Sequence, residues 1–159
     1  ALSNELGVLP MYGASTGASL IKGWAGQMGS SLVPISSFDK TASLFTKGKR
    51  CFVMIDIEGA ELGCLKGATS LLNSAENNDF LIEVSINQHQ PEGIIINPNL
   101  VETFQLMNSY GYTGFTADSD LRKIELSEVV EIASTNIDTL KVHNFLFTKS
   151  DKILNEVKS

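Results

Sequence analysis

The sequence has few of the residues that build disulfide scaffolds and metal centres. Its 159 residues include two cysteines, Cys51 and Cys64, and two histidines. These residues form no CxxC or HExxH pattern, and the chain contains no N-glycosylation sequon. Neither a disulfide framework nor a structural zinc site is therefore indicated. We expect two free thiols and no metal ion.

Long apolar runs and an excess of basic charge are also missing. No run approaches the roughly 18 apolar residues that a membrane span requires. Twelve Lys and Arg stand against 18 Asp and Glu, which gives a formal net charge of -6. A chain of this charge repels a phosphate backbone. We expect neither a membrane nor nucleic acid as a partner and, because no secretion signal is recognisable, a cytoplasmic protein.

The motifs that bind nucleotides through glycine-rich turns are absent as well. The sequence contains no GxG, no GxxxxGK[ST] and no GxSxG. This excludes the usual dinucleotide fingerprint, the phosphate loop and the nucleophile elbow of serine hydrolases.

What remains is the composition of one ordinary globular domain, with 43% hydrophobic and 19% charged residues. Residues 1–40 form a loop- and hairpin-rich segment, because closely spaced Gly and Ser leave no room for a helix of normal length in residues 1–37. We expect a hairpin around Gly7 and a strand at 32–35. The run 14–19 is interpreted as a flexible hairpin tip.

Residues 51–148 carry the pattern of a β/α core. The continuous apolar run 51–55 is typical of a fully buried, parallel strand. After Gly59 the spacing becomes helical, with apolar residues three or four apart up to Leu72. Further strands are predicted at 80–84, 112–116 and 144–148, a helix from Leu100 to a C-cap at Gly111, loops with one short helix at 118–138, and a tail at 149–159 with a short helix at 151–159. The order indicates an α/β domain with a mainly parallel sheet.

Acidic residues stand where two of the predicted strands end. Asp56 and Glu58 follow the first buried strand, Glu83 lies near the end of the next, and His89 lies in the loop beyond. Ligands of open α/β sheets bind at the carboxyl ends of the strands. Structural roles are open alternatives: Glu58 and Glu61 at a helix N-terminus, Asp56 as a cap, Glu83 in an ion pair, and His89 exposed to solvent.

The segment that follows the first buried strand carries a family resemblance. Ile55-Asp56-Ile57-Glu58-Gly59-Ala60-Glu61, continued by Leu65-Lys66-Gly67-Ala68, resembles the D-x-E-G-x-E and L-x-G-A signature of FkbM-type methyltransferases. Other segments are similar in the same order: 1–3 with Gly7, 17–20, a short strand at 35–39, 81–84, 111–112 and 144–147. The resemblance covers nearly the whole chain.

The resemblance implies a Rossmann-like class I methyltransferase fold that binds S-adenosylmethionine. Such enzymes begin with a strand, a glycine-rich turn and a second strand that ends in an acid for the ribose. This chain shows no match to them, so it resembles a single partial domain, residues 1–159, lacking the N-terminal cofactor-binding strands. An exposed sheet edge in such a domain favours self-association, and we expect a homo-oligomer.

The resemblance also implies a reaction, which is methyl transfer to the hydroxyl of a small molecule such as a sugar or polyketide. Asp56 is the first candidate to position or deprotonate that hydroxyl, with Glu58 and Glu83 in support and His89 as the alternative base. Asp56, Ile57 and Glu58 would contact the cofactor.

Two other functions stay open. The chain could be a non-catalytic interaction module that uses its exposed edge for a partner. Alternatively, Asp56, Glu58 and Glu83 could be the acids of a sugar hydrolase, which requires two carboxyl groups about 5 to 9.5 Å apart.

Overall fold

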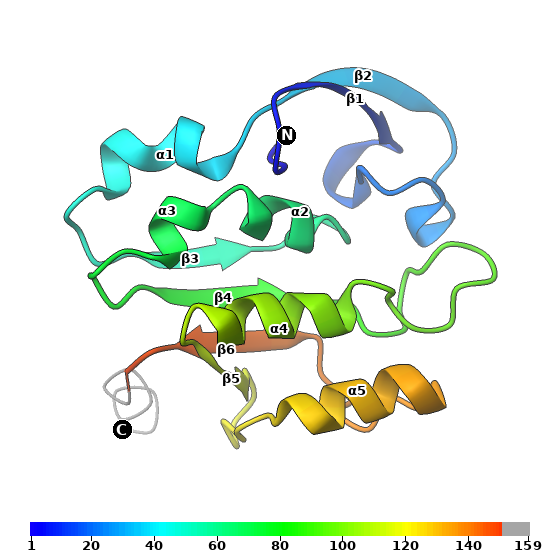
Figure 1. Cartoon of the computed structure of the whole chain (residues 1–159). Coiled ribbons are helices and arrows are strands. Elements are labelled where there is room, and N and C mark those ends of the chain that lie inside the picture. The colour runs from blue at the N-terminus through cyan, green and yellow to red at the C-terminus, as the bar shows by residue number, and fades with distance from the viewer. Residues whose placement is uncertain (151–159) are drawn as a thin grey trace.

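The computed structural model describes residues 1–150; the expected helix at 151–159 lies outside them. Within residues 1–150 the chain forms a two-stranded sheet, a four-stranded sheet and five α-helices (Figure 1). None of these helices has the length and apolar character needed to span a bilayer.

The four-stranded sheet has mixed strand directions. Its strands are β3 (Phe52–Ile55), β4 (Asp79–Glu83), β5 (Thr113–Thr116) and β6 (Asn144–Thr148), in the order β3-β4-β6-β5. β3 and β4 are parallel, whereas β6 runs antiparallel to both β4 and β5. The prediction of a mainly parallel sheet is therefore wrong. An apolar strand reports its burial and not its direction, and only the tertiary structure shows that β6 runs the other way.

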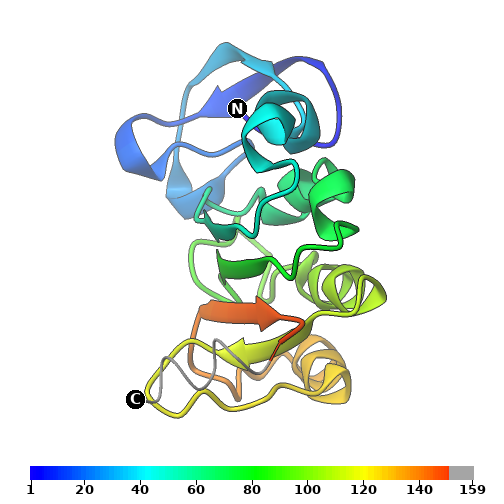
Figure 2. The same cartoon turned by 90° about the vertical axis from the view of Figure 1, so that its left-hand side faces the viewer.

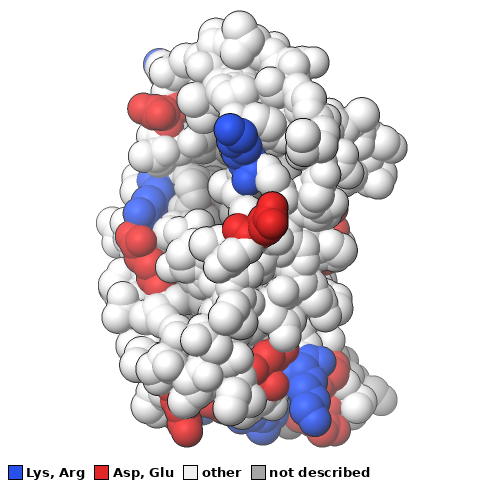
Figure 3. Space-filling view, turned by 90° about the vertical axis from the view of Figure 1, so that its right-hand side faces the viewer, with Lys and Arg blue, Asp and Glu red and all other residues white. Residues whose placement is uncertain are grey.

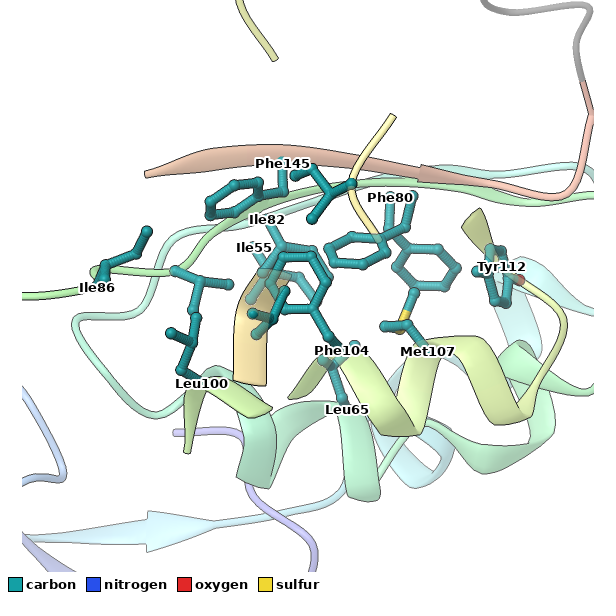
Figure 4. Close-up of a cluster of buried hydrophobic side chains, with 14 of the residues drawn as sticks. Ile55, Leu65, Phe80, Ile82, Ile86, Leu100, Phe104, Met107, Tyr112 and Phe145 are labelled. Carbon is teal, nitrogen blue, oxygen red and sulfur yellow. The ribbon is translucent and has the colours of Figure 1, made fainter. Parts of the chain in front are cut away.

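The helices that cover this sheet all lie on one of its faces (Figure 2). They are α2 (Glu61–Lys66), α3 (Thr69–Leu72), α4 (Leu100–Ser109) and α5 (Leu126–Thr135). The core lies between this helical layer and the sheet (Figure 4). Phe104 of α4 packs edge-on against Phe145 and Phe147 of β6, with ring centroids 5.2 and 5.1 Å apart. All three rings are buried.

β3 differs from the fully buried strand that its apolar run predicts. Phe52 and Met54 are 58% and 68% exposed, whereas Ile55 on the other face packs into the core. β3 is an edge strand, and no helix of residues 1–150 covers its outer face (Figure 2). A continuous apolar run does not distinguish two buried faces from one buried and one open face.

The N-terminal segment forms an antiparallel ribbon of two strands, in keeping with the hairpin-rich segment expected there. β1 (Gly7–Tyr12) pairs with β2 (Ser30–Ile35), with Gly7 opposite Ile35. Gly7 therefore begins a strand and is not the centre of a hairpin turn, so that detail of the prediction is wrong. Residues 13–29 connect the two strands through two short 3-10 turns, Ser15–Gly17 and Trp24–Gly26.

A helix follows β2 in a region where the resemblance to FkbM-type methyltransferases implied a short strand at 35–39. α1 (Phe38–Thr46) begins after Ser37, whose hydroxyl accepts a hydrogen bond from the Lys40 amide at 3.2 Å. This is an ordinary serine N-cap. The helix fully buries none of its residues, and Leu44 is 92% exposed. The sequence therefore contains no fully buried apolar stripe from which this helix could be predicted.

The helix predicted after Gly59 is divided into α2 and α3 at Gly67. A Cβ at Gly67 would collide with the carbonyl oxygen of Ser3, so the N-terminal segment passes too close for any other residue. Asp39 of α1 then accepts a hydrogen bond from the Ser70 amide at 2.8 Å. The expected short helix within 118–138 is α5, and Gly111 follows α4 with a φ of +83°, as its C-cap role requires.

Candidate active site

The turn that follows β3 is closed by a buried carboxylate. Glu61, 3% exposed, accepts hydrogen bonds through Oε1 from the amides of Gly59 at 2.9 Å and Ile57 at 3.3 Å. Burial raises the pKa of Glu61, and these backbone amides oppose the increase. Glu61 therefore fixes the conformation of the turn. The sequence had suggested only that its charge would favour a helix N-terminus.

Glu58 is fixed in this turn by residues from the β1–β2 connection. Its carboxylate Oε2 accepts a hydrogen bond from Trp24 Nε1 at 2.8 Å, and its carbonyl accepts one from the Ser19 hydroxyl. Its φ of +58° is left-handed, a conformation that costs energy for a residue with a side chain. A backbone strained in this way and held by two side chains from another segment is typical of functional sites.

Gly59 allows the indole ring to come this close. Its φ is +91°, and a Cβ there would lie 2.5 Å from the six-membered ring of Trp24. Trp24 is 3% exposed and therefore forms part of the packed base of the site.

Glu83 ends β4, the strand that pairs with β3. Burial raises its pKa, and the negative charges of Asp56 and Glu58 raise it further, whereas His143 and His89 lower it. Ile55 pairs with Ile82 in the sheet, so Asp56 and Glu83 stand at the same level of two neighbouring strands. Trp24 lies near both Glu58 and His89. A carboxylate whose pKa is raised is better suited to accept a proton near neutral pH.

His89 combines an exposed side chain with a fixed backbone. Its φ is +61°, and its carbonyl accepts a hydrogen bond from the Ala25 amide at 2.7 Å. Its ring centroid lies 6.2 Å from that of Trp24. The alternative in which His89 is exposed to solvent is thus correct. The ring nevertheless lies near Trp24, whose indole donates a hydrogen bond to Glu58.

Three residues of this site were not predicted: Ser19, Trp24 and His143. His143 directly precedes β6, and its carbonyl accepts the Val84 amide at 2.6 Å. It reaches the carboxyl end of β4 only because β6 is antiparallel, which the predicted parallel sheet did not provide. The one signal in the sequence was Trp24, a lone tryptophan in a glycine-rich segment. Such a residue does not reveal which other side chain it will contact.

A cavity of about 340 Å³ lies against this turn, on the side of the β1–β2 ribbon. Thr16, Ala18 and Leu20 line one wall, and Asp56 and Glu58 line the opposite one. Figure 3 looks onto the side where β3 and β4 end, and most of that surface is uncharged. The remaining lining residues are mainly apolar: Ala1, Leu2, Met11, Ile57 and Ala60.

The acidic residues do not form a metal centre. Across residues 1–150, no group of three or more His, Cys, Asp or Glu side chains is arranged to hold a metal ion.

Comparison with known proteins adds no family to this description. No family model, no curated protein and no solved structure matches the chain. The resemblance to FkbM-type methyltransferases therefore stays a prediction from the quoted motif.

Proposed function

We propose that this chain forms the acceptor side of an S-adenosylmethionine-dependent O-methyltransferase with a Rossmann-like fold of the FkbM type. Two acidic side chains that line the cavity, Asp56 and Glu58, carry the proposal, with Glu83 at the end of the neighbouring strand β4 and His89 in the loop that follows it. The residues of the quoted motif also have separate tasks: Glu61 closes the turn, Gly59 admits the indole, and Asp56 lines the cavity.

The residues present suit S-adenosylmethionine in charge and in shape. When bound, the cofactor supplies a methyl group on a positively charged sulfonium. Asp56 and Glu58 line one cavity together with apolar side chains, so the sulfonium would be attracted to these carboxylates at the edge of the cavity, next to an acceptor that occupies it. Asp56, Ile57 and Glu58 would be the contacts that this chain provides.

The carboxylates would divide the work on the acceptor hydroxyl between them. Asp56 is exposed and would accept a hydrogen bond from the hydroxyl, which orients the oxygen for attack. Glu83, whose pKa is raised by burial and by its acidic neighbours, would take the proton. Glu58 is held by Trp24 and would contribute a fixed negative charge.

Calorimetric titration with S-adenosylmethionine and S-adenosylhomocysteine tests this proposal. The two ligands differ in the charge on sulfur. Asp56→Asn should weaken S-adenosylmethionine binding by roughly tenfold and S-adenosylhomocysteine binding much less, because removing one nearby charge costs on the order of 1 kcal/mol. Asp120→Asn, at an exposed position outside the site, is the matched control and should leave both affinities unchanged. If neither ligand binds, the proposal is refuted.

The open face of the sheet favours a second candidate, a non-catalytic interaction module that pairs with another copy or with a partner. Phe52 and Met54 expose apolar surface on an edge strand, which is a common site of association. Light scattering at micromolar concentration should then show a dimer or larger oligomer, and Met54→Lys should shift it toward the monomer. A monomeric wild-type chain would contradict self-association.

A further inference from the structure

The β1–β2 connection, residues 13–29, is a closed loop that reaches from the ribbon to the active site. Its ends are joined by a hydrogen bond from the Gly13 amide to the Gly29 carbonyl at 3.2 Å. Tyr12 and Ser19 exchange two further backbone hydrogen bonds, at 2.7 and 3.0 Å. Gly13 and Gly29 both have a φ of +78°, so the two ends carry residues of high backbone freedom. This arrangement allows the loop to move as one unit about its base.

The polar contacts between this loop and the main sheet's loops converge on two residues. Trp24 Nε1 and the Ser19 hydroxyl donate to Glu58, and the Ala25 amide donates to the carbonyl of His89. Glu58 and His89 follow β3 and β4, respectively. The loop is thus fastened at the place where the candidate catalytic residues lie.

The same loop supplies one wall of the 340 Å³ cavity. Thr16, Ala18 and Leu20 come from it, whereas Asp56 and Glu58 belong to the turn after β3. The cavity exists in this shape only while the loop is fastened. No Lys, Arg or His side chain lines it, and Asp56 and Glu58 are its two charged side chains, so an anionic group placed beside them would be repelled.

We propose that Trp24 is a positioning residue, whose indole N–H latches the β1–β2 connection to Glu58 and so forms the wall of a cavity for an uncharged, hydroxyl-bearing ligand. Opening of the latch would release the loop and admit the ligand, and closing would complete the wall against Asp56. That this ligand is the methyl acceptor rests on the proposed function, but the latch itself does not.

Amide hydrogen exchange on the intact chain tests the latch. Trp24→Phe keeps an aromatic ring and removes the donor to Glu58. The amide of Ala25, which donates to His89 across the latch, should then exchange roughly tenfold faster, while those of Tyr12 and Ser19, bonded to each other at the base of the loop, and those of β4 are unchanged. Glu58→Gln, in a chain that retains Trp24, keeps an acceptor for the indole and should exchange as slowly as the wild type, whereas Glu58→Leu should behave like Trp24→Phe. Unchanged exchange at Ala25, or an equal increase throughout β4, would overturn the latch.

Equilibrium dialysis with 4-nitrophenyl glucoside, a neutral hydroxyl compound, and with its 6-phosphate tests the cavity. The neutral probe should bind to the wild type and roughly tenfold more weakly to Trp24→Phe, and the phosphate should bind more weakly than the neutral probe. No saturable binding, equal binding to both variants, or preference for the phosphate would overturn the cavity assignment. If the neutral probe behaves as expected while neither S-adenosylmethionine nor S-adenosylhomocysteine binds, the proposed function fails and the latch stands.

Discussion

Replacement of Gly59 by alanine should destabilise the fold and disturb the site through two separable effects. The first is the left-handed φ of +91°, which costs an alanine roughly 1–2 kcal/mol. The second is the contact of the new Cβ with the Trp24 ring at 2.5 Å, and overpacking of this kind costs about 1–3 kcal/mol. The free energy of unfolding of Gly59→Ala should therefore fall by about 2–5 kcal/mol.

Urea unfolding followed by circular dichroism measures this loss, with Gly93→Ala as the matched control. Gly93 has a similar φ of +83° and no atom within 4 Å of its would-be Cβ, so its variant carries the backbone cost alone. Trp24 is the chain's one tryptophan, so the native fluorescence of Gly59→Ala should also change. Equal destabilisation by the two variants, with unchanged Trp24 emission, would refute the close packing of the indole on the turn.

Three further predictions concern the groups buried around the site and the core. Cys64 is 1% exposed and burial raises its pKa to about 11, so a thiol reagent at pH 8 should modify the half-buried Cys51 and reach Cys64 only on unfolding; two equally fast thiols would contradict this. Glu83 has a raised pKa when folded, so its protonated form stabilises the fold at low pH, and this contribution is lost as the pH rises from the ordinary value of 4.5 through the raised one. The stability gained by Glu83→Gln over the wild type should therefore grow across that pH interval, and a gain independent of pH would disprove the burial effect. Arg50 bonds the nearly buried Asp79 at 2.8 Å, so Arg50→Met should cost about 1–3 kcal/mol, whereas Lys123→Met, which breaks an exposed pair with Glu125, should cost at most about 1 kcal/mol; equal losses would refute the role of burial.

The strands were the part of the fold that the sequence predicted best. The run 144–148 coincides with β6, and 80–84 differs from β4 by one residue at each end. Uninterrupted β-branched and aromatic residues mark a strand that packs at least one face against the core. Strand direction depends instead on how the chain returns to the sheet, and residues 117–143 return it antiparallel.

The N-terminal ribbon and α1 show where such patterns give no information. α1 buries no residue fully, and its large apolar residues Leu44 and Phe45 face solvent, so its apolar residues form no clear core-facing stripe. The need for a glycine at position 67 results from the approach of Ser3, which is remote in sequence. Contacts of this kind are decided by tertiary packing.

The candidate site was predictable for the same reason that β3 and β4 were. Asp56, Glu58 and Glu83 stand at strand ends, and parallel strands place their ends together. Trp24 and Ser19 lie more than 30 residues before Glu58, in a segment without regular spacing. Their hydrogen bonds to Glu58 become visible only in three dimensions.

The central claim, a site for S-adenosylmethionine beside Asp56 and Glu58, is tested most directly by fluorescence titration of Trp24 with that ligand. The single tryptophan is buried and bonded to Glu58, so a ligand in the adjoining cavity should change its emission. We expect a saturable change in Trp24 emission, which should be lost when a bulky side chain fills the cavity, as in Ala18→Phe. No change up to millimolar ligand would contradict it.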